Sequence, residues 1–589
     1  MKILLTAINA KYIHSNPAVV DLKAYAESAG LAPDTTIHVA TYTINQPKDQ
    51  TLRDIYAATP DVLIFSCYIW NITLVTSLVG DMAALRPDLP IWLGGPEVSY
   101  ECEETLACLP GVTGIMIGEG ELIFHRLVQA YENGAPLTSV PGIIFRGNDG
   151  TPVRTGTLGK NGQATAFDLS DLPFPYENVS ADSHRIYYYE SSRGCPFSCS
   201  YCLSSVDKHL RFRDLTQVFR DLDRFLEARV PQVKFIDRTF NAGKAHAMAI
   251  WQYILEHDNG VTNFHFEAAA DLIDEAMLAL FARMRPGLIQ LEIGVQSTNP
   301  DTLATIRRVM DFDKVSAVVQ KINALGNIHQ HLDLIAGLPF EDYTRFGQSF
   351  DEVFALAPAQ LQLGFLKVLK GSYMFDHRGD YGLIYTADAP YEVLRTKWLT
   401  FDDVIRLKGI EDMVERFYNS HQFDNAVTYL LRFFDRPFTF FEALAAFFDT
   451  HTQPGAALSR AALCAVLLDF AKENVPEAAA GLQTLLIFDI YLREKAKSRP
   501  AFAEDVAAHK SLISEKARSL WENESASDAQ SDHPAVSYKQ FLHDTHQEVF
   551  ACDPEELLSS GQIVPCRGVY HFDYRKRDPL TYNAAVRVI

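Results

Sequence analysis

The sequence predicts an α/β protein with three parts: a doubly wound parallel sheet, a partial β/α barrel and a mostly helical C-terminal domain. Short apolar segments alternate with amphipathic segments through residues 1–145, and the same alternation resumes at residue 181 and runs to 371. From residue 372 to 589 the pattern is mainly helical. A chain of 589 residues is also too long for one core, because single cores rarely grow past about 300 residues.

Residues 1–145 are predicted to form the doubly wound sheet. Amphipathic stretches at 19–30 and 74–87 indicate helices, and apolar runs that are typical of buried strands occupy 2–9, 35–44, 61–69, 90–95 and 114–120. The opening run has one lysine and is followed by polar residues, so we interpret it as a strand rather than a signal peptide. Sheets of this kind bind ligands outside the carboxyl ends of their strands. We therefore expect the binding site in the loops 9–17, 66–71, 94–99 and 118–121.

The partial barrel is predicted over residues 181–371, after a hairpin and linker at 146–180 that is rich in glycine, threonine, asparagine and proline. Six apolar runs separated by helical segments predict six βα units, at 186–192, 232–240, 264–271, 288–297, 329–339 and 360–370. A closed barrel of this type has eight units, so six indicate an open one. Catalytic groups are expected at the carboxyl ends of its strands.

The C-terminal part is predicted to be mainly helical. Helical patterns occupy 391–420, 457–474 and 482–498, a polar surface loop is expected at 522–534, and one or two strands are expected within 568–589. We find no residue in this part whose chemistry can be assigned from the sequence.

The composition limits the classes of partner. The chain has 53 Lys and Arg against 74 Asp and Glu, a net charge of −21, which disfavours nucleic acid as a partner. It has no apolar run of 18 residues that would span a membrane. Without a targeting segment we expect a cytoplasmic protein, in which thiols stay reduced and clustered cysteines indicate metal or redox chemistry.

Three of the nine cysteines lie together in RGCPFSCSYC, directly after the first barrel strand. Cys195, Cys199 and Cys202 have a spacing at which thiolates can hold one inorganic centre. Structural zinc requires four ligands, and the nearest candidate for the fourth is His209. A [4Fe-4S] cluster can be held by three thiolates, which leaves one iron open to a small molecule. A trio of buried structural thiols is the third alternative.

This motif, CxxxCxxC with the aromatic Tyr201 before the third cysteine, resembles that of the radical S-adenosylmethionine (SAM) enzymes. The resemblance implies that Cys195, Cys199 and Cys202 bind three irons of a [4Fe-4S] cluster. The fourth iron would then chelate SAM, which is cleaved to methionine and a 5′-deoxyadenosyl radical that abstracts hydrogen from a substrate.

The resemblance also implies further SAM contacts. Members of the family often carry a Gly-Gly-Glu-like turn after the second strand, where this chain has Asp237 and no glycine pair. Asp237 is the candidate acceptor for the SAM amino group. Glu267 and Gln296 lie where family members reach the ribose and the carboxylate, or else are satisfied polar residues of the barrel interior. Gly337 would let the backbone approach the adenine.

A doubly wound domain before such a barrel resembles the cobalamin-binding subclass of the family. The resemblance implies that cobalamin contacts come from the loops of the first domain, with the candidates Asn9, Tyr12, Ser66, Tyr68, Gly94, Gly95, Pro96, Gly118, Glu119 and Gly120. The chain lacks the Asp-x-His-x-x-Gly motif that brings a histidine to cobalt. Cobalamin would therefore be held without a protein histidine on the metal. The alternative is a sheet that binds no cofactor and supports the barrel.

These features predict a cobalamin-dependent radical SAM enzyme, and we expect a methyltransferase acting on an unactivated carbon of a small molecule, with a flavodoxin- or ferredoxin-type electron donor implied by the family. The alternatives are radical oxidation, cyclisation or ring rearrangement with cobalamin, and a non-catalytic cobalamin or iron–sulfur sensor. A tRNA-modifying role would need a basic surface. The C-terminal domain resembles one of unassigned function on some proteins of this subclass.

Overall fold

The computed structural model describes residues 1–156, 167–181, 185–453, 455, 457–528, 536–566 and 568–589. The chain divides into two compact units. The first holds residues 1–328, 337–341 and 365–400, and the second holds 329–336, 342–364 and 401–589. Among the described residues, no helix has both the length and the apolar character needed to cross a membrane.

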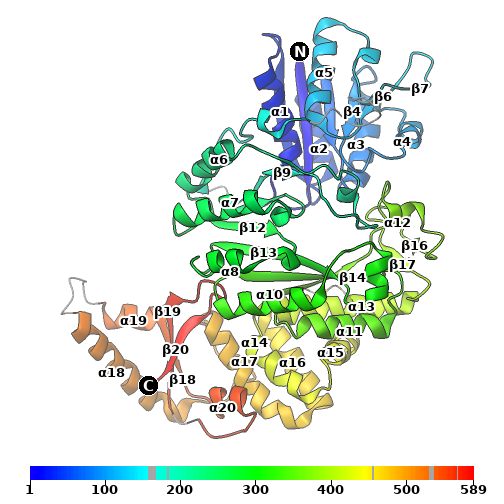
Figure 1. Cartoon of the computed structure of the whole chain (residues 1–589). Coiled ribbons are helices and arrows are strands. Elements are labelled where there is room, and N and C mark those ends of the chain that lie inside the picture. The colour runs from blue at the N-terminus through cyan, green and yellow to red at the C-terminus, as the bar shows by residue number, and fades with distance from the viewer. Residues whose placement is uncertain (157–166, 182–184, 454, 456, 529–535, 567) are drawn as a thin grey trace. The chain divides into compact units, whose positions relative to one another are not determined.

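The first unit begins with a seven-stranded sheet in the order β2-β1-β3-β4-β5-β6-β7 (Figure 1). The first five strands in this order pair in parallel, and β6 and β7 are antiparallel additions at the edge. The strands are β1 (Lys2–Asn9), β2 (Thr36–Thr43), β3 (Val62–Ser66), β4 (Ile91–Gly94), β5 (Gly114–Met116), β6 (Ile143–Arg146) and β7 (Pro152–Arg154). The helices are α1 (Pro17–Ala29), α2 (Lys48–Ala57), α3 (Ile72–Leu85), α4 (Cys102–Cys108) and α5 (Gly120–Asn133).

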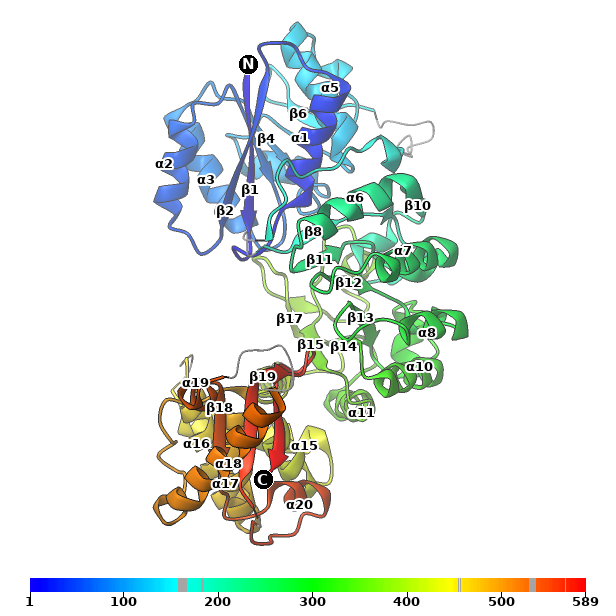
Figure 2. The ribbon, with the colours of Figure 1, turned by 90° about the vertical axis from the view of Figure 1, so that its left-hand side faces the viewer.

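Helices cover both faces of this sheet. Figure 2 shows α1 and α5 on one face and α2 and α3 on the other. Side chains alternate along β1, so that Ile3 and Leu5 pack with α1 and α5 while Leu4 packs toward α2 and α3. Burial on both faces explains why these strands read as continuous apolar runs. The predicted doubly wound sheet is confirmed.

The first unit continues into a second parallel sheet, in which β8 (Tyr187–Tyr189), β11 (Gln232–Phe235), β12 (Asn263–Glu267) and β13 (Ile289–Gln296) pair in that order. A short antiparallel pair, β9 (Ser192–Arg193) and β10 (Arg211–Phe212), brackets the cysteine loop. The helices here are α6 (Leu215–Glu227), α7 (Lys244–Glu256), α8 (Glu275–Phe281), α9 (Pro300–Thr305) and α10 (Phe312–Leu325). Residues 365–400 add α12 (Tyr373–Asp376), β16 (Ile384–Tyr385) and β17 (Val393–Arg395).

The second unit holds the last two predicted barrel strands, β14 (His329–Ala336) and β15 (Gln360–Phe365), with α11 (Tyr343–Phe354) between them in the chain. Its helices are α13 (Phe401–Met413), α14 (Asp424–Leu430), α15 (Pro437–His451), α16 (Arg460–Asn474), α17 (Ala479–Arg493), α18 (Lys510–Asp528), α19 (Tyr538–Asp544) and α20 (Pro554–Ser559). An antiparallel sheet of β18 (Thr545–Glu548), β19 (Tyr570–Arg577) and β20 (Ala584–Val588) packs against α17 through Phe488 and Phe572.

Three predictions differ from the structure at element boundaries. Residues 391–400 are not helical, because Val393 donates its N–H to the Leu366 carbonyl and β17 pairs with β16. Residues 522–528 continue α18 where a loop was predicted, and the rest of that predicted loop lies outside the described residues. Strands β19 and β20 confirm the predicted C-terminal strands, while β18 was missed.

Candidate active site

The cysteine loop is closed at its base by backbone contacts. Gly194 has a φ of +97°, and a Cβ at this position would lie 2.4 Å from the His209 carbonyl oxygen. The Cys195 N–H donates to the Asp207 carbonyl at 3.0 Å, which ties the two ends of the loop together two residues after β9 and four residues before β10. Only glycine allows this close approach.

The three thiols of the loop are free and largely shielded from solvent. Cys195 and Cys199 are 8% and 7% exposed, and Cys202 is half-buried. Arg308 donates from Nη1 to the Cys199 sulfur at 3.7 Å and from Nη2 to the Gly294 carbonyl. Burial raises the pKa of the Cys199 thiol, and the positive charge of Arg308 opposes that shift. The arginine therefore favours the thiolate that metal binding requires.

The three thiols suit a [4Fe-4S] cluster by their chemistry, because thiolates are the usual ligands of such clusters. Among the described residues, no three His, Cys, Asp or Glu side chains converge on one metal position, as a zinc site would require. A [4Fe-4S] cluster binds each thiolate through a different iron, so its ligands need not meet at one point. The loop thus offers three free thiols without a preformed site for one ion.

Asp237 contacts the two serines that directly precede the cysteine loop. Its carboxylate accepts hydrogen bonds from the Ser191 N–H at 3.0 Å, the Ser191 hydroxyl at 2.7 Å and the Ser192 hydroxyl at 2.6 Å. Burial raises the pKa of Asp237 to about 6, although these hydrogen bonds act to lower it. Both oxygens thus already bind the residues just before the loop, and the predicted contact with the SAM amino group stays a prediction.

Three other predicted SAM residues lie at the end of β13, in the cysteine loop and directly after β14. Gln296 ends β13 with a φ of +73°, and its Oε1 is buried without a hydrogen-bond partner in the described structure. Tyr201 is half-buried close to Arg308 and Cys199, and burial raises the pKa of its hydroxyl. Gly337 has a φ of +91°, and a Cβ there would lie 2.7 Å from Val393 Cγ1. Packing alone therefore requires glycine at this position.

A cavity of about 320 Å³ lies where the loops of the first sheet meet the ends of β11 and β12. It brings together the predicted residues Asn9, Tyr68 and Glu267. His14 and Trp70 in its wall belong to the predicted loops 9–17 and 66–71, whereas the sequence did not indicate Tyr188, Lys234 and Arg238. Ring stacking of Tyr68 on Trp70, with centroids 4.3 Å apart, gives one side of the cavity a flat aromatic surface.

A row of charged groups borders this cavity within the second sheet. Lys234 donates to Glu292 at 2.9 Å, and His265 Nε2 lies 3.0 Å from the same carboxylate. Burial alone would raise the pKa of Glu292. Its contacts with His265 and Lys234 outweigh burial and hold the pKa well below its usual value. Glu292 therefore stays ionised and fixes the Lys234 ammonium at the cavity wall.

A second, narrower pocket of about 100 Å³ enters the first sheet on the side of α1. Its wall contains the predicted residues Ser66, Gly94, Gly95, Gly118 and Gly120. A Cβ on Gly95, which has a φ of +112°, would lie 2.5 Å from the Cys67 carbonyl oxygen. This close approach of two backbone segments requires glycine at position 95, whereas the Cβ position of Gly118 has nothing within 4 Å, so the backbone there is open to a ligand.

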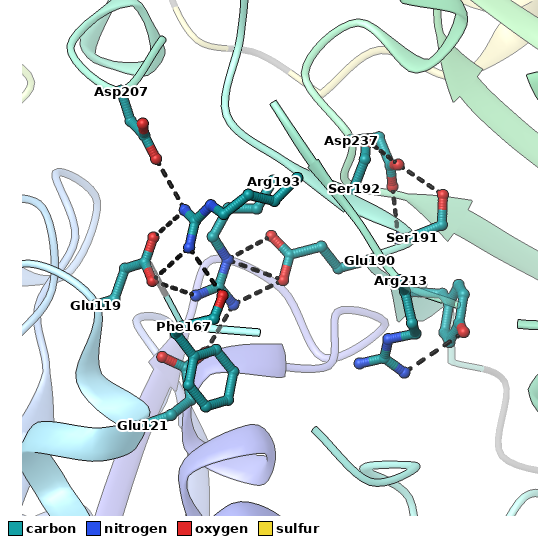
Figure 3. A network of polar contacts seen from close by, with 12 residues as sticks. Glu119, Glu121, Phe167, Glu190, Ser191, Ser192, Arg193, Asp207, Arg213 and Asp237 are labelled. Atoms are coloured by element: carbon teal, nitrogen blue, oxygen red, sulfur yellow. Dashed lines mark hydrogen bonds and ion pairs between the residues drawn. The ribbon is translucent and has the colours of Figure 1, made fainter. Parts of the chain in front are cut away.

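Three predicted cobalamin residues line neither cavity. Tyr12 is exposed, as is Pro96. The carboxylate of Glu119 instead forms ion pairs with Arg193 and Arg211 beside the cysteine loop (Figure 3).

Three family models match successive parts of the chain. Residues 3–128 match the B12 binding domain, and residues 189–353 match the Radical SAM superfamily. The fold, the cysteine loop and these two matches identify a B12-binding domain followed by a radical SAM domain. Residues 379–564 match a further family, described as a protein of unknown function (DUF4080), so the third part belongs to a family without an assigned role.

Two curated relatives carry different activities. The chain is 28% identical over 307 residues to the cobalamin-dependent radical SAM methyltransferase TokK of Streptomyces tokunonensis, covering 49% of this chain and 44% of TokK. It is 22% identical over 352 residues to the anaerobic magnesium-protoporphyrin IX monomethyl ester cyclase of Rubrivivax gelatinosus, covering 58% and 61%. The chain spans about half the length of the first curated relatives that it matches.

A solved structure supports the fold. The cobalamin-dependent S-adenosylmethionine radical enzyme OxsB, with aqua-cobalamin bound, matches with a TM-score of 0.59 at 14% identity, over 83% of this chain and 79% of OxsB. At this identity the match establishes a shared fold and leaves the reaction open.

Proposed function

We propose that the protein is a cobalamin-dependent radical SAM enzyme that methylates an unactivated carbon of a small-molecule substrate. The observation that carries the proposal is the 320 Å³ cavity, whose wall combines the loops of the B12-binding domain with the ends of barrel strands. When bound, the cluster supplies the electron that cleaves SAM, and cobalamin carries the methyl group.

Different residues of the chain are proposed to hold the cluster and cobalamin. Cys195, Cys199 and Cys202 hold the cluster, and Arg308 stabilises the Cys199 thiolate by its charge. Asp237 keeps the backbone before the loop in place through Ser191 and Ser192. Glycines of the narrow pocket make room for a cofactor against the ends of β4 and β5.

Cobalamin is proposed to bind without a histidine on cobalt. His14 lines the 320 Å³ cavity, and its Nδ1 lies 2.7 Å from the Tyr188 hydroxyl, so Nε2 is its one ring nitrogen for which a metal contact is tested below. Burial, together with the charges of Lys11 and Lys234, lowers the pKa of His14. EPR of the protein with Co(II) cobalamin tests this point. Nitrogen splitting from a protein ligand would contradict it, and its absence with cobalamin in the base-off form supports it.

The substrate is proposed to carry an anionic group. Arg238 lies in the cavity wall and is exposed, and no acidic partner is found for it among the residues described. Lys234 adds a second positive charge, balanced by Glu292. An unbalanced guanidinium beside aromatic surface suits a carboxylate or phosphate joined to an apolar body.

Product analysis separates this reaction from its rivals. Anaerobically reconstituted protein with SAM and a reductant is expected to form 5′-deoxyadenosine. With substrate, methylation adds one CH₂ to the product mass, whereas cyclisation or rearrangement adds none. The cyclase relative favours the second reaction as the alternative. Failure to cleave SAM after full reconstitution would favour a sensor. The flavodoxin- or ferredoxin-type donor and the cytoplasmic location stay predictions.

A further inference from the structure

The two ends of the cysteine loop bind one carboxylate from the B12-binding domain. Arg193 in β9 and Arg211 in β10 are paired opposite each other across the base of the loop. Glu119 Oε2 accepts from Arg211 Nη1 at 3.0 Å and lies 3.4 Å from Arg193 Nη1, and its Oε1 also pairs with Arg211 (Figure 3). One side chain of the first domain thus bridges both flanks of the loop that carries the cluster ligands.

The contacts of Glu119 are shielded from solvent. The side chains of Arg193, Arg211 and Glu119 are only 17%, 16% and 27% exposed. Ion pairs in such surroundings are screened less by salt than those on the surface. Arg193 is also held by Glu190 at 2.7 Å and by Glu121 at 2.6 Å.

Both arginines keep acidic partners when Glu119 loses its charge. Arg193 retains Glu121 and Glu190, and Arg211 retains Asp207 at 2.8 Å. Removing one partner of a buried ion pair usually costs much stability because the other charge is left unpaired. A neutral side chain at position 119 leaves neither arginine unpaired, so we expect no such loss. What it removes is the ion pair between Arg211 and the B12-binding domain, and with it the bridge between the two flanks of the loop, while Glu121 still holds Arg193.

Glu119 also belongs to the turn beside the narrow pocket. Its neighbours Gly118 and Gly120 line that pocket, as does Glu121. Gly118 has a φ of +87°, a backbone conformation that residues other than glycine rarely adopt. The same short turn therefore meets the pocket proposed for cobalamin and the arginines that flank the cysteine loop.

We propose that Glu119 is a positioning residue that couples cobalamin binding to retention of the cluster. This inference rests on the proposed cofactors. Ordering of the 118–121 turn by cobalamin holds Arg193 and Arg211 in place and keeps the loop closed around the cluster. Coupling of binding free energies is reciprocal, so the cluster also tightens cobalamin binding by the same factor.

The test compares full-length wild type with Glu119→Gln and with Glu103→Gln as a matched control. Glu103 pairs with Arg154 at 2.8 Å in the same sheet domain, and both side chains are about half exposed. Two quantities are measured for each protein: the rate at which a chelator removes iron with and without hydroxocobalamin, and the Kd of hydroxocobalamin with and without the reconstituted cluster. For wild type and E103Q we expect each ratio to be at least about five-fold.

In E119Q both ratios are expected to fall toward one, while each cofactor alone still binds. A purely structural ion pair would lower both affinities and leave the ratios unchanged, which would overturn the proposal. Arg211→Gln cuts the same link from the other side and serves if E119Q does not fold. Wild type that binds both cofactors without coupling refutes this inference alone, and wild type that binds neither refutes the proposed function as well.

Discussion

Replacement of Gly194 by alanine is predicted to open the cysteine loop. The new Cβ would lie 2.4 Å from the His209 carbonyl oxygen and 2.9 Å from its carbon, both backbone atoms that no side-chain rotation can move. Reaching ordinary contact requires the two ends of the loop to separate by about 1 Å. A shift of that size breaks the 3.0 Å hydrogen bond from Cys195 to Asp207.

The cost of this substitution has two parts. A side chain in the left-handed region costs about 1 to 2 kcal/mol. Loss of the loop hydrogen bond adds about 0.5 to 1.5 kcal/mol. With some residual strain the total is about 2 to 4 kcal/mol, which shifts the balance from closed to open loop by a factor of about 30 to 1000.

Iron content measures the result. Reconstituted G194A is expected to hold little iron while its far-UV circular dichroism stays that of wild type. Gly260→Ala is the control, because Gly260 has a φ of +73° but nothing within 4 Å of the position that a methyl group would take. The G260A variant has only the free-energy cost of a side chain in the left-handed region, and we expect it to retain its iron. G194A with the iron content and cluster stability of wild type would refute the reasoning.

Three further predictions concern single side chains. Cys199→Ala is expected to abolish iron binding, whereas alanine at the exposed Cys108 leaves it unchanged; equal iron loss in both would contradict the ligand assignment. Arg308→Gln removes a positive charge beside the Cys199 sulfur, so redox titration is expected to give a more negative cluster potential, and an unchanged potential would exclude this role. Burial raises the pKa of Asp489 to about 7, so the folded state binds this proton more tightly than the unfolded state. Stability should therefore fall as pH rises from about 4 to about 7; Asp489→Asn should flatten this dependence in urea unfolding, and an equally steep dependence would contradict it.

The sequence predicts the parallel strands well because their burial leaves a direct signal. Strands covered on both faces need continuous apolar runs, and residues 2–9 became β1 as predicted. Strands of two residues have no such signal, so β9 and β10 were missed. In 391–400, apolar residues at helical spacing gave the wrong element, because tertiary hydrogen bonds of Val393 override local pattern.

The candidate site shows the same limit. The spacing of Cys195, Cys199 and Cys202 is local, so the motif identifies them directly. Arg308 was missed because it reaches Cys199 across 109 positions of the chain. Asp237 was predicted from its place after a strand, and only the structure reveals that Ser191 and Ser192 occupy its oxygens. Partnerships set by the fold leave no pattern in a single sequence.

The most direct test of the proposed cofactors is the metal content of anaerobically reconstituted protein, followed by EPR of the reduced protein with and without SAM. The account predicts about four irons and one cobalt per chain, with a cluster signal that changes when SAM is added. About one zinc per chain without iron would contradict it, because the cysteine loop would then be a structural metal site.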